Sequence, residues 1–120
     1  MVDYSDSIDE QTFKMKYIKE ELKPRYKKVF CIETEETVAG FPDVMAIDDT
    51  NRVTLLEFKF ARGNRIKFKP TQPGFYKRNS DLSIWIVAYN KNKNEVHIFE
   101  AEEMFTEGKY KMNERAEVKL

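Results

Sequence analysis

The sequence predicts an α/β domain in which a central mixed β-sheet is flanked by helices. Three observations carry this prediction. A segment near the N-terminus has apolar residues at helical spacing. Two β-rich runs joined by turn-forming residues indicate a hairpin. A continuously apolar run later in the chain indicates a strand buried on both faces, as parallel strands are.

The length of the chain, 120 residues, is that of one domain. We therefore expect a single domain over residues 1–120, with residues 1–7 and about 108–120 at its periphery. Hydrophobic residues make up 41% of the chain and charged residues 35%, so an ordered core can form and a wholly disordered chain is excluded.

Cysteine usage and the N-terminus bear on the compartment. Cys31 is the only cysteine, which excludes an internal disulfide and a cysteine-rich zinc site. The N-terminus is polar and acidic, and no run approaches the roughly 18 apolar residues of a membrane span. We expect a cytoplasmic protein without a membrane partner, in the host cell cytoplasm if a phage encodes it.

The first helix is expected to be capped by Asp6 and Ser7 and to end before Pro24. Residues 29–33 are predicted as a short strand, and residues 34–41 as an irregular link or a second short strand. The apolar positions of the helix are Ile8, Phe13, Tyr17, Ile18 and Leu22.

A hairpin is predicted next, with strands at residues 44–47 and 53–60 around the turn-forming residues 48–52. The rest of the chain is predicted in order as a basic loop (62–70), a helix opened by Thr71 and Pro73 and ending near 79, a buried strand (82–89), a turn (90–94), a last strand (96–99) and a terminal helix (101–107).

The second hairpin strand carries a carboxylate and an ammonium group. Side chains alternate along a strand, so Glu57 and Lys59 share one face, opposite Phe58. If the turn centres on Thr50, Asp43 lies opposite Glu57, at a Cβ separation of about 5 Å where like charges repel. A hard divalent cation relieves this repulsion, and we expect roughly one or two Mg²⁺ ions, with Mn²⁺ as a substitute.

Lys59 beside such an ion can orient or deprotonate the attacking water and stabilise charge on a phosphate. Taken alone, an E-x-K pattern in so charged a chain is more often a surface salt bridge, worth little. The joint spacing with Asp43 favours phosphodiester hydrolysis.

Residues 58–80 contain seven basic residues and no acidic one. A run of this kind commonly forms a solvated loop. Because it directly follows the strand with the carboxylate, we expect it to contact DNA phosphates, foremost through Arg62, Arg65 and Lys67. The full set of expected nucleic-acid-binding residues is Arg62, Arg65, Lys67, Lys69, Lys77 and Arg78.

Three motifs in order, GFPD (40–43), LEFK (56–59) and PTQ (70–72) with Tyr76 four residues after the glutamine, resemble the VRR-NUC branch of the PD-(D/E)XK nucleases. The chain is also similar to the small Holliday junction resolvases of archaea and phages. The resemblance covers about residues 10–89. It implies the restriction-endonuclease-like core and a nuclease activity that depends on Mg²⁺.

By this resemblance, Asp43 and Glu57 are metal ligands, the main-chain carbonyl of Phe58 is a further ligand, Lys59 is the catalytic lysine and Gln72 opens a helix near the site.

The family also supplies an acid from its first helix, for which Glu10 fits best and Glu20 and Glu21 are the alternatives. One departure is that Thr37, Val38 and Ala39 stand where an arginine is often found, which leaves substrate contacts open.

The expected function is that of a Mg²⁺-dependent endodeoxyribonuclease acting on branched DNA as a homodimer, a Holliday junction resolvase. The alternatives are a flap or nick nuclease of the VRR-NUC type, a nuclease-fold module that binds without cutting, and an unrelated α/β protein with surface salt bridges. His97 is expected to be a structural or surface residue, and Cys31, Trp85 and Tyr89 are expected to be core residues.

Overall fold

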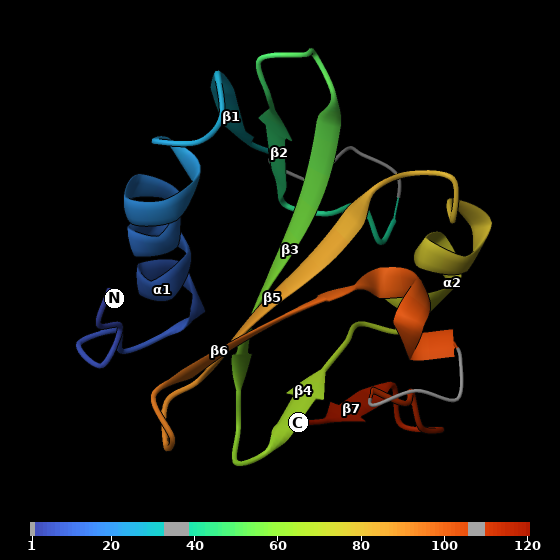
Figure 1. Cartoon of the computed structure of the whole chain (residues 1–120). Coiled ribbons are helices and arrows are strands. Elements are labelled where there is room, and N and C mark those ends of the chain that lie inside the picture. The colour runs from blue at the N-terminus through green and yellow to red at the C-terminus, as the bar shows by residue number, and fades with distance from the viewer. Residues whose placement is uncertain (1, 33–38, 106–109) are drawn as a thin grey trace.

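A five-stranded mixed sheet forms the centre of the protein in the computed structural model, which describes residues 2–32, 39–105 and 110–120 (Figure 1). The elements in chain order are α1 (Glu10–Tyr17), η1 (Ile18–Leu22), β1 (Lys28–Cys31), β2 (Val44–Ile47), β3 (Val53–Ala61), β4 (Arg65–Lys67), α2 (Thr71–Arg78), β5 (Ile84–Asn90), β6 (Glu95–Glu100), η2 (Ala101–Phe105) and β7 (Glu117–Lys119).

The strand order of this sheet is β1-β2-β3-β5-β6. β2 and β3 form the predicted antiparallel hairpin, whereas β3 and β5 pair in parallel. The α/β class and the mixed sheet with flanking helices are therefore confirmed. The apolar run of β5 follows from this position, because a central strand is covered on both faces.

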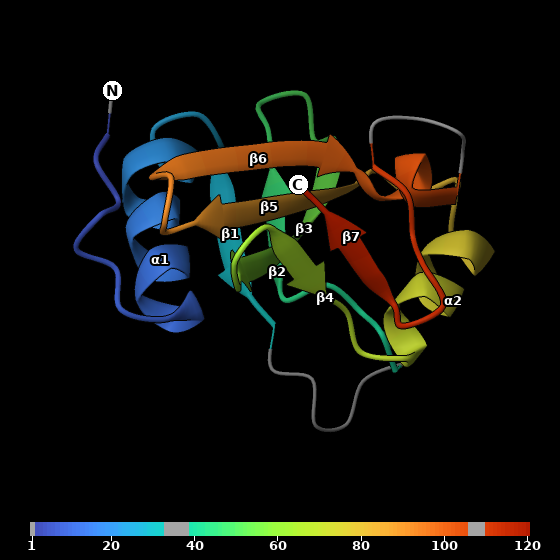
Figure 2. The same cartoon turned by 90° about the horizontal axis from the view of Figure 1, so that it is seen from below.

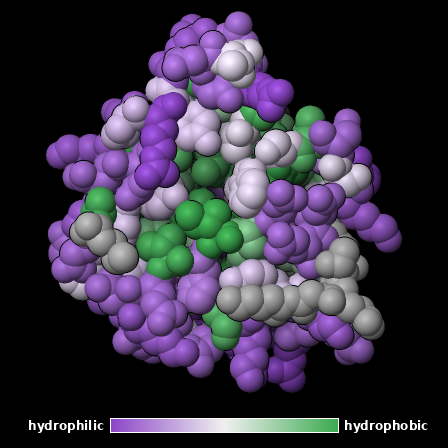
Figure 3. Space-filling view, viewed as in Figure 1, coloured by the Kyte–Doolittle hydropathy of each residue, from purple (hydrophilic) through white to green (hydrophobic). Residues whose placement is uncertain are grey.

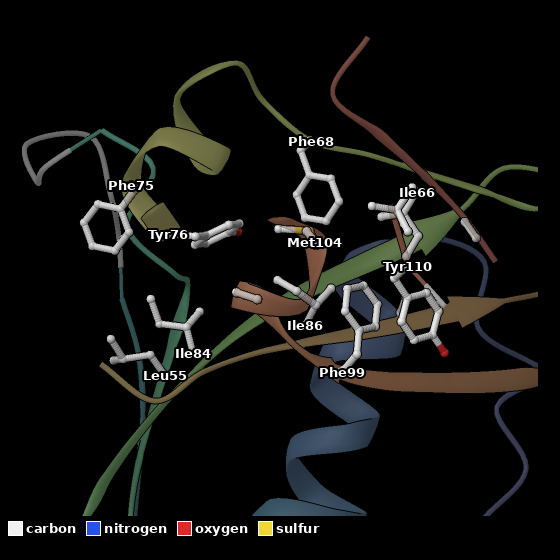
Figure 4. Close-up of a cluster of buried hydrophobic side chains, with 14 residues drawn as sticks. Leu55, Ile66, Phe68, Phe75, Tyr76, Ile84, Ile86, Phe99, Met104 and Tyr110 are labelled. Carbon is white, nitrogen blue, oxygen red and sulfur yellow. The ribbon is translucent and has the colours of Figure 1, made fainter. Parts of the chain in front are cut away.

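Each face of the sheet carries its own hydrophobic cluster. On one face α1 and η1 pack Phe13, Tyr17 and Leu22 against Phe58 of β3. On the other face α2 and η2 cover side chains of β3, β5 and β6, and Figure 4 shows Tyr76, Phe68 and Met104 gathered over them. Because β3 lies between the two clusters, even its polar residues are largely withdrawn from water.

The first helix begins later than predicted. Asp9, not Asp6 or Ser7, is the N-cap, because its side chain accepts the backbone N–H of Thr12 while the Thr12 hydroxyl accepts the backbone N–H of Asp9. Ile8 therefore lies outside the helix and is 74% exposed. The helical segment continues as a π-turn through η1 and ends before Pro24, as predicted.

Two strands were not predicted as such. The basic loop contains β4, and strand 96–99 is not the last, because β7 follows and pairs with β4 in a separate two-stranded sheet.

The predicted terminal helix is a short 3₁₀ turn, η2. α2 starts at Thr71 itself, after Pro70 and without a side-chain cap. Most of segment 34–41 lies outside the described residues.

The two ends of the chain, expected at the periphery, contribute to the core. Tyr4 packs on Phe13 and Tyr89, and Val118 of β7 is fully buried with Ile66 of β4. Among the described residues, no helix has the length and apolar character needed to cross a membrane.

Candidate functional site

The candidate site lies where β3 extends beyond its neighbour β2. β2 pairs with β3 only as far as Val44 opposite Leu56, whereas β5 accompanies β3 to Ala61. The segment from Glu57 onward therefore has a sheet neighbour on one side only among the described strands. Figure 1 shows β3 continuing beyond the start of β2, beside β5.

The predicted hairpin register is confirmed, with Ile47 opposite Val53 and Met45 opposite Leu55. Asp43 immediately precedes β2, so continuation of this register puts it opposite Glu57. The Asp43 Oδ1 atom is buried and has no hydrogen-bond partner within the described part of the chain. Its Oδ2 atom lies 3.8 Å from Nζ of Lys14, which reaches across from α1.

The electrostatics of the two carboxyl groups show that they share one site. Burial, followed by the charges of Glu57 and Glu10, raises the pKa of Asp43 to about 7, although Lys14 acts in the opposite direction. Burial also raises the pKa of Glu57, against the stabilising charge of Lys59. Glu57 raises the pKa of Asp43, and Glu10 raises the pKa of both carboxyl groups, so added positive charge is favourable at this site.

Lys59 is held in place by three contacts. Its Nζ atom lies 3.4 Å from Oε2 of Glu57 and donates a 2.9 Å hydrogen bond to Oε1 of Gln72. The ammonium group also lies 4.9 Å from the ring centroid of Phe68. Gln72 accepts a second hydrogen bond from the backbone N–H of Lys69, at 2.8 Å. Gln72 at the start of α2 is thus joined to the site, and it fixes the lysine head group.

Gly40 explains how the segment that carries Asp43 approaches α2. Its φ is +89°, a conformation that side chains disfavour. A Cβ atom there would lie 2.6 Å from the carbonyl oxygen of Thr71 and 2.8 Å from Cβ of Phe75. Only glycine permits this contact, which aligns the buried Pro42 and the partly buried Asp43 with β3.

A groove of about 630 Å³ opens beside the site. Glu10, in the first turn of α1, lines it together with Lys59, and Glu10 is close enough to raise the pKa of both buried carboxyl groups. Arg62, Arg65 and Lys67 line the same groove. Glu10 is therefore the helix acid that the geometry supports.

The structure divides the six expected nucleic-acid-binding residues into two groups. Arg62, Arg65 and Lys67 line the groove. Lys69, Lys77 and Arg78 do not, because the first lies next to the Gln72 contact and the others lie exposed in the last turn of α2. The guanidinium of Arg78 is folded back over Gly74.

Two residues of the site were not predicted. Lys14 faces Asp43. Because Lys14 lies four residues after Glu10, the two side chains share one helix face, and this spacing in the sequence could have indicated that Lys14 is near the site. The hydroxyl of Tyr76 is buried, without a hydrogen-bond partner among the described residues, and burial together with the charges of Glu57 and Asp43 raises its pKa. It therefore remains a protonated donor beside the two acids.

The donor set fits a hard cation. Asp43 and Glu57 are oxygen donors, Glu10 stands at the groove, and the orphaned Oδ1 of Asp43 lacks a positive partner. The side chain of Phe58 is buried on the opposite face, so only its main chain is available to a ligand. Within residues 2–32, 39–105 and 110–120, no group of three or more His, Cys, Asp or Glu side chains is placed close enough together to hold a metal ion by itself.

The remaining polar candidates lie away from the site. His97 of β6 bonds to Glu95 at 3.1 Å, which agrees with a structural role. Cys31 is exposed at the end of β1, so the prediction of a core cysteine is wrong. Tyr89 is fully buried, whereas Trp85 is only partly buried.

Comparison with models of known protein families gives no match, and a search of curated proteins also finds none. The site must therefore be interpreted from its own geometry.

Proposed function

We propose that this protein is a Mg²⁺-dependent endodeoxyribonuclease of the PD-(D/E)XK type that cleaves branched DNA, with Holliday junctions as its substrate. One observation carries the proposal. Two carboxyl groups, the partly buried Asp43 and the buried Glu57, lie near the tethered ammonium of Lys59, and Lys59 lines a groove that three basic side chains also line. This combination provides a cation site, a proton-transfer group and phosphate ligands in one place.

The residues that would hold the metal are Asp43, Glu57, Glu10 and the main-chain carbonyl of Phe58. When bound, a divalent cation lowers the pKa of coordinated water and neutralises charge on the scissile phosphate. Asp43 and Glu57 supply the negative charge for this, since their carboxyl groups ionise readily once a cation offsets their mutual repulsion.

Lys59 acts at the scissile phosphate in this proposal. The hydrogen bond to Gln72 and the contact with Glu57 limit its rotamers, and the residue lines the groove. There it orients the attacking water and stabilises the negative charge that develops on the phosphate oxygens. Gln72 is a positioning residue, because it acts through Lys59.

Arg62, Arg65 and Lys67 bind the phosphates that flank the scissile bond. Their charges neutralise the backbone without reading bases, which suits recognition of DNA structure rather than sequence. A junction has two symmetric strands to cut, so we propose a two-fold homodimer with two such sites.

The test is cleavage of a labelled panel (four-way junction, flap, nicked duplex and single strand) in Mg²⁺, Mn²⁺ or EDTA. We expect paired cuts in the junction that require metal and disappear in Asp43→Asn. Cleavage of only the flap or the nicked duplex would assign the VRR-NUC-type activity instead. Tight binding without cleavage in any metal would contradict catalysis and favour a binding module.

A further inference from the structure

The two-stranded sheet of β4 and β7 lies at the edge of the domain, and Figure 2 shows the two strands side by side. Its inner face is apolar, since Ile66 and Val118 are opposite each other and fully buried. Its outer face carries Arg65, Lys67 and Lys119, which are all exposed. In Figure 3, mostly hydrophilic side chains cover the lower margin of the molecule, where Figure 1 draws this sheet.

The pairing of β4 and β7 brings like charges together. Arg65 is directly opposite Lys119, an arrangement that disfavours strand pairing unless negative charge compensates. Glu117, on the same outer face, supplies one such charge, with its Oε2 atom 3.5 Å from Nη1 of Arg65. Glu117 offsets one of the three positive charges on this face. The remaining two favour binding of an anion.

This surface is continuous with the groove at the candidate site. Arg65 lines that groove and also a second hollow of about 350 Å³, which is otherwise formed by Asn113, Glu114 and Arg115 in the turn before β7. Basic side chains therefore extend from Arg62 through Arg65 to Arg115. A polyanion that fills the groove can follow this path onto the C-terminal segment.

The C-terminal segment is fixed to the domain by several backbone hydrogen bonds. The N–H of Leu120 donates to the carbonyl of Asn64 at 2.6 Å, and the N–H of Phe68 donates to the carbonyl of Ala116 at 2.8 Å. With Val118 buried, the charges on β7 are preorganised and lose little backbone freedom on binding.

We propose that the outer face of β4 and β7 is a second phosphate-binding surface, on which Arg65, Arg115 and Lys119 hold the backbone of a duplex DNA arm leading away from the cleaved phosphate. This rests on the proposed function for the choice of DNA as the ligand. It assigns a binding role to the C-terminal segment, beyond the part of the chain that carries the nuclease motifs. Duplex DNA suits the surface because its phosphates form a continuous anionic track.

The test is binding of a fluorescently labelled four-way junction and of a plain duplex, measured by anisotropy in EDTA at several salt concentrations. Lys119→Gln and Arg115→Gln are each expected to weaken binding about fivefold to tenfold and to reduce the salt slope by about one. Glu114→Gln is the matched control, because it removes a negative instead of a positive charge from the same hollow. It is expected to tighten binding about threefold. Lys23→Gln, at the end of η1 and outside both hollows, is expected to leave affinity unchanged.

The outcomes separate this inference from the proposed function. Weaker binding by Lys119→Gln and Arg115→Gln supports the surface even if no DNA is cleaved, because the assay contains no divalent metal. Unchanged affinity in both variants overturns it, even if the wild type cleaves junctions. A wild type that binds no DNA overturns it as well. The inference is also overturned if both variants lose binding to anionic vesicles while their affinity for DNA stays unchanged, because the surface then binds a membrane.

Discussion

Two strand pairs of this protein place like charges opposite each other, and they differ in burial. Continued by one residue, the register of β2 and β3 sets Asp43, with a side chain 22% exposed, opposite Glu57, whose side chain is 8% exposed. The pair of β4 and β7 sets Arg65, with a side chain 58% exposed, opposite Lys119. In the low dielectric of the interior the acid pair is strongly repulsive, whereas water and salt screen the basic pair.

This difference explains why the two pairs suit different ligands. The buried acids need a fixed counter-ion at short range, and a small hard cation meets that need. The exposed bases need only a mobile anionic partner, and in our proposal that partner is the DNA backbone, which binds with a strength that depends on salt. One strand connection, residues 62–64 between β3 and β4, joins the two regions, and Lys59 and Arg65 line the same groove.

Removal of the site's ammonium group is expected to have the largest effect. Lys59→Met keeps the length of the side chain but removes the charge that stabilises the transition state, and we expect junction cleavage in Mg²⁺ to fall by about 10³-fold. Lys67→Met, on the groove wall, is the control and should lower it by about tenfold or less. Cleavage by Lys59→Met within a few-fold of wild type would remove Lys59 from the chemistry.

Loss of the lysine's hydrogen-bond partner is expected to come next. Gln72→Leu leaves the backbone N–H of Lys69 and the ammonium of Lys59 without their acceptor. We expect the free energy of unfolding to fall by about 1–3 kcal/mol and cleavage by roughly tenfold to a hundredfold. Gln72→Glu, which keeps an acceptor, should restore the bond to Lys59. If single-turnover rates are equal in Gln72→Leu and wild type, Gln72 has only a structural role.

The pH dependence of stability tests the buried acid pair. The pKa of Asp43 is raised from 3.8 to about 7, so folding favours its protonated form. The stability from this group is fully present below about pH 4 and is lost as the pH rises through about 7. In EDTA, the melting temperature of wild type should therefore fall over this window by several degrees more than that of Asp43→Asn. Parallel curves for the two proteins would contradict the buried pair.

The smallest effects are expected on DNA affinity, when single exposed basic residues are replaced. These effects should be larger for residues that line the groove than for residues that do not. Arg62→Gln is expected to weaken junction binding about fivefold, because it lines the groove. Lys77→Gln on α2 should change affinity by less than about twofold, since this residue lies outside it. Both are exposed, so fluorescence anisotropy compares folded proteins. Equal weakening by both would show that DNA extends over α2 as well.

The part of the fold that the sequence predicted is the part encoded by local pattern. The β2–β3 register followed from apolar residues that match around Thr50, and the faces of β3 followed from alternation. These two patterns were enough to bring Asp43, Glu57 and Lys59 together. The place of Gln72 near the site came from the resemblance rather than from pattern, and its hydrogen bond to Lys59 was not predicted.

The features that were missed depend on contacts distant in sequence. β7 is only three residues long, and Val118 is buried because of its partner Ile66 rather than through any periodicity. The contact of Lys14 with Asp43 depends on how α1 lies on the sheet. Asp6 and Ser7 were plausible caps, but Asp9 and Thr12 form the reciprocal capping pair.

The central claim is that the buried acid pair holds a divalent cation, and Mn²⁺ binding followed by electron paramagnetic resonance tests it most directly. We predict that the wild type binds about one or two Mn²⁺ ions per chain, that Mg²⁺ competes for them, and that Asp43→Asn and Glu57→Gln lower the affinity at least about tenfold while Glu114→Gln does not. The absence of Mn²⁺ binding by a folded wild type, or equal binding by all four proteins, would contradict the claim.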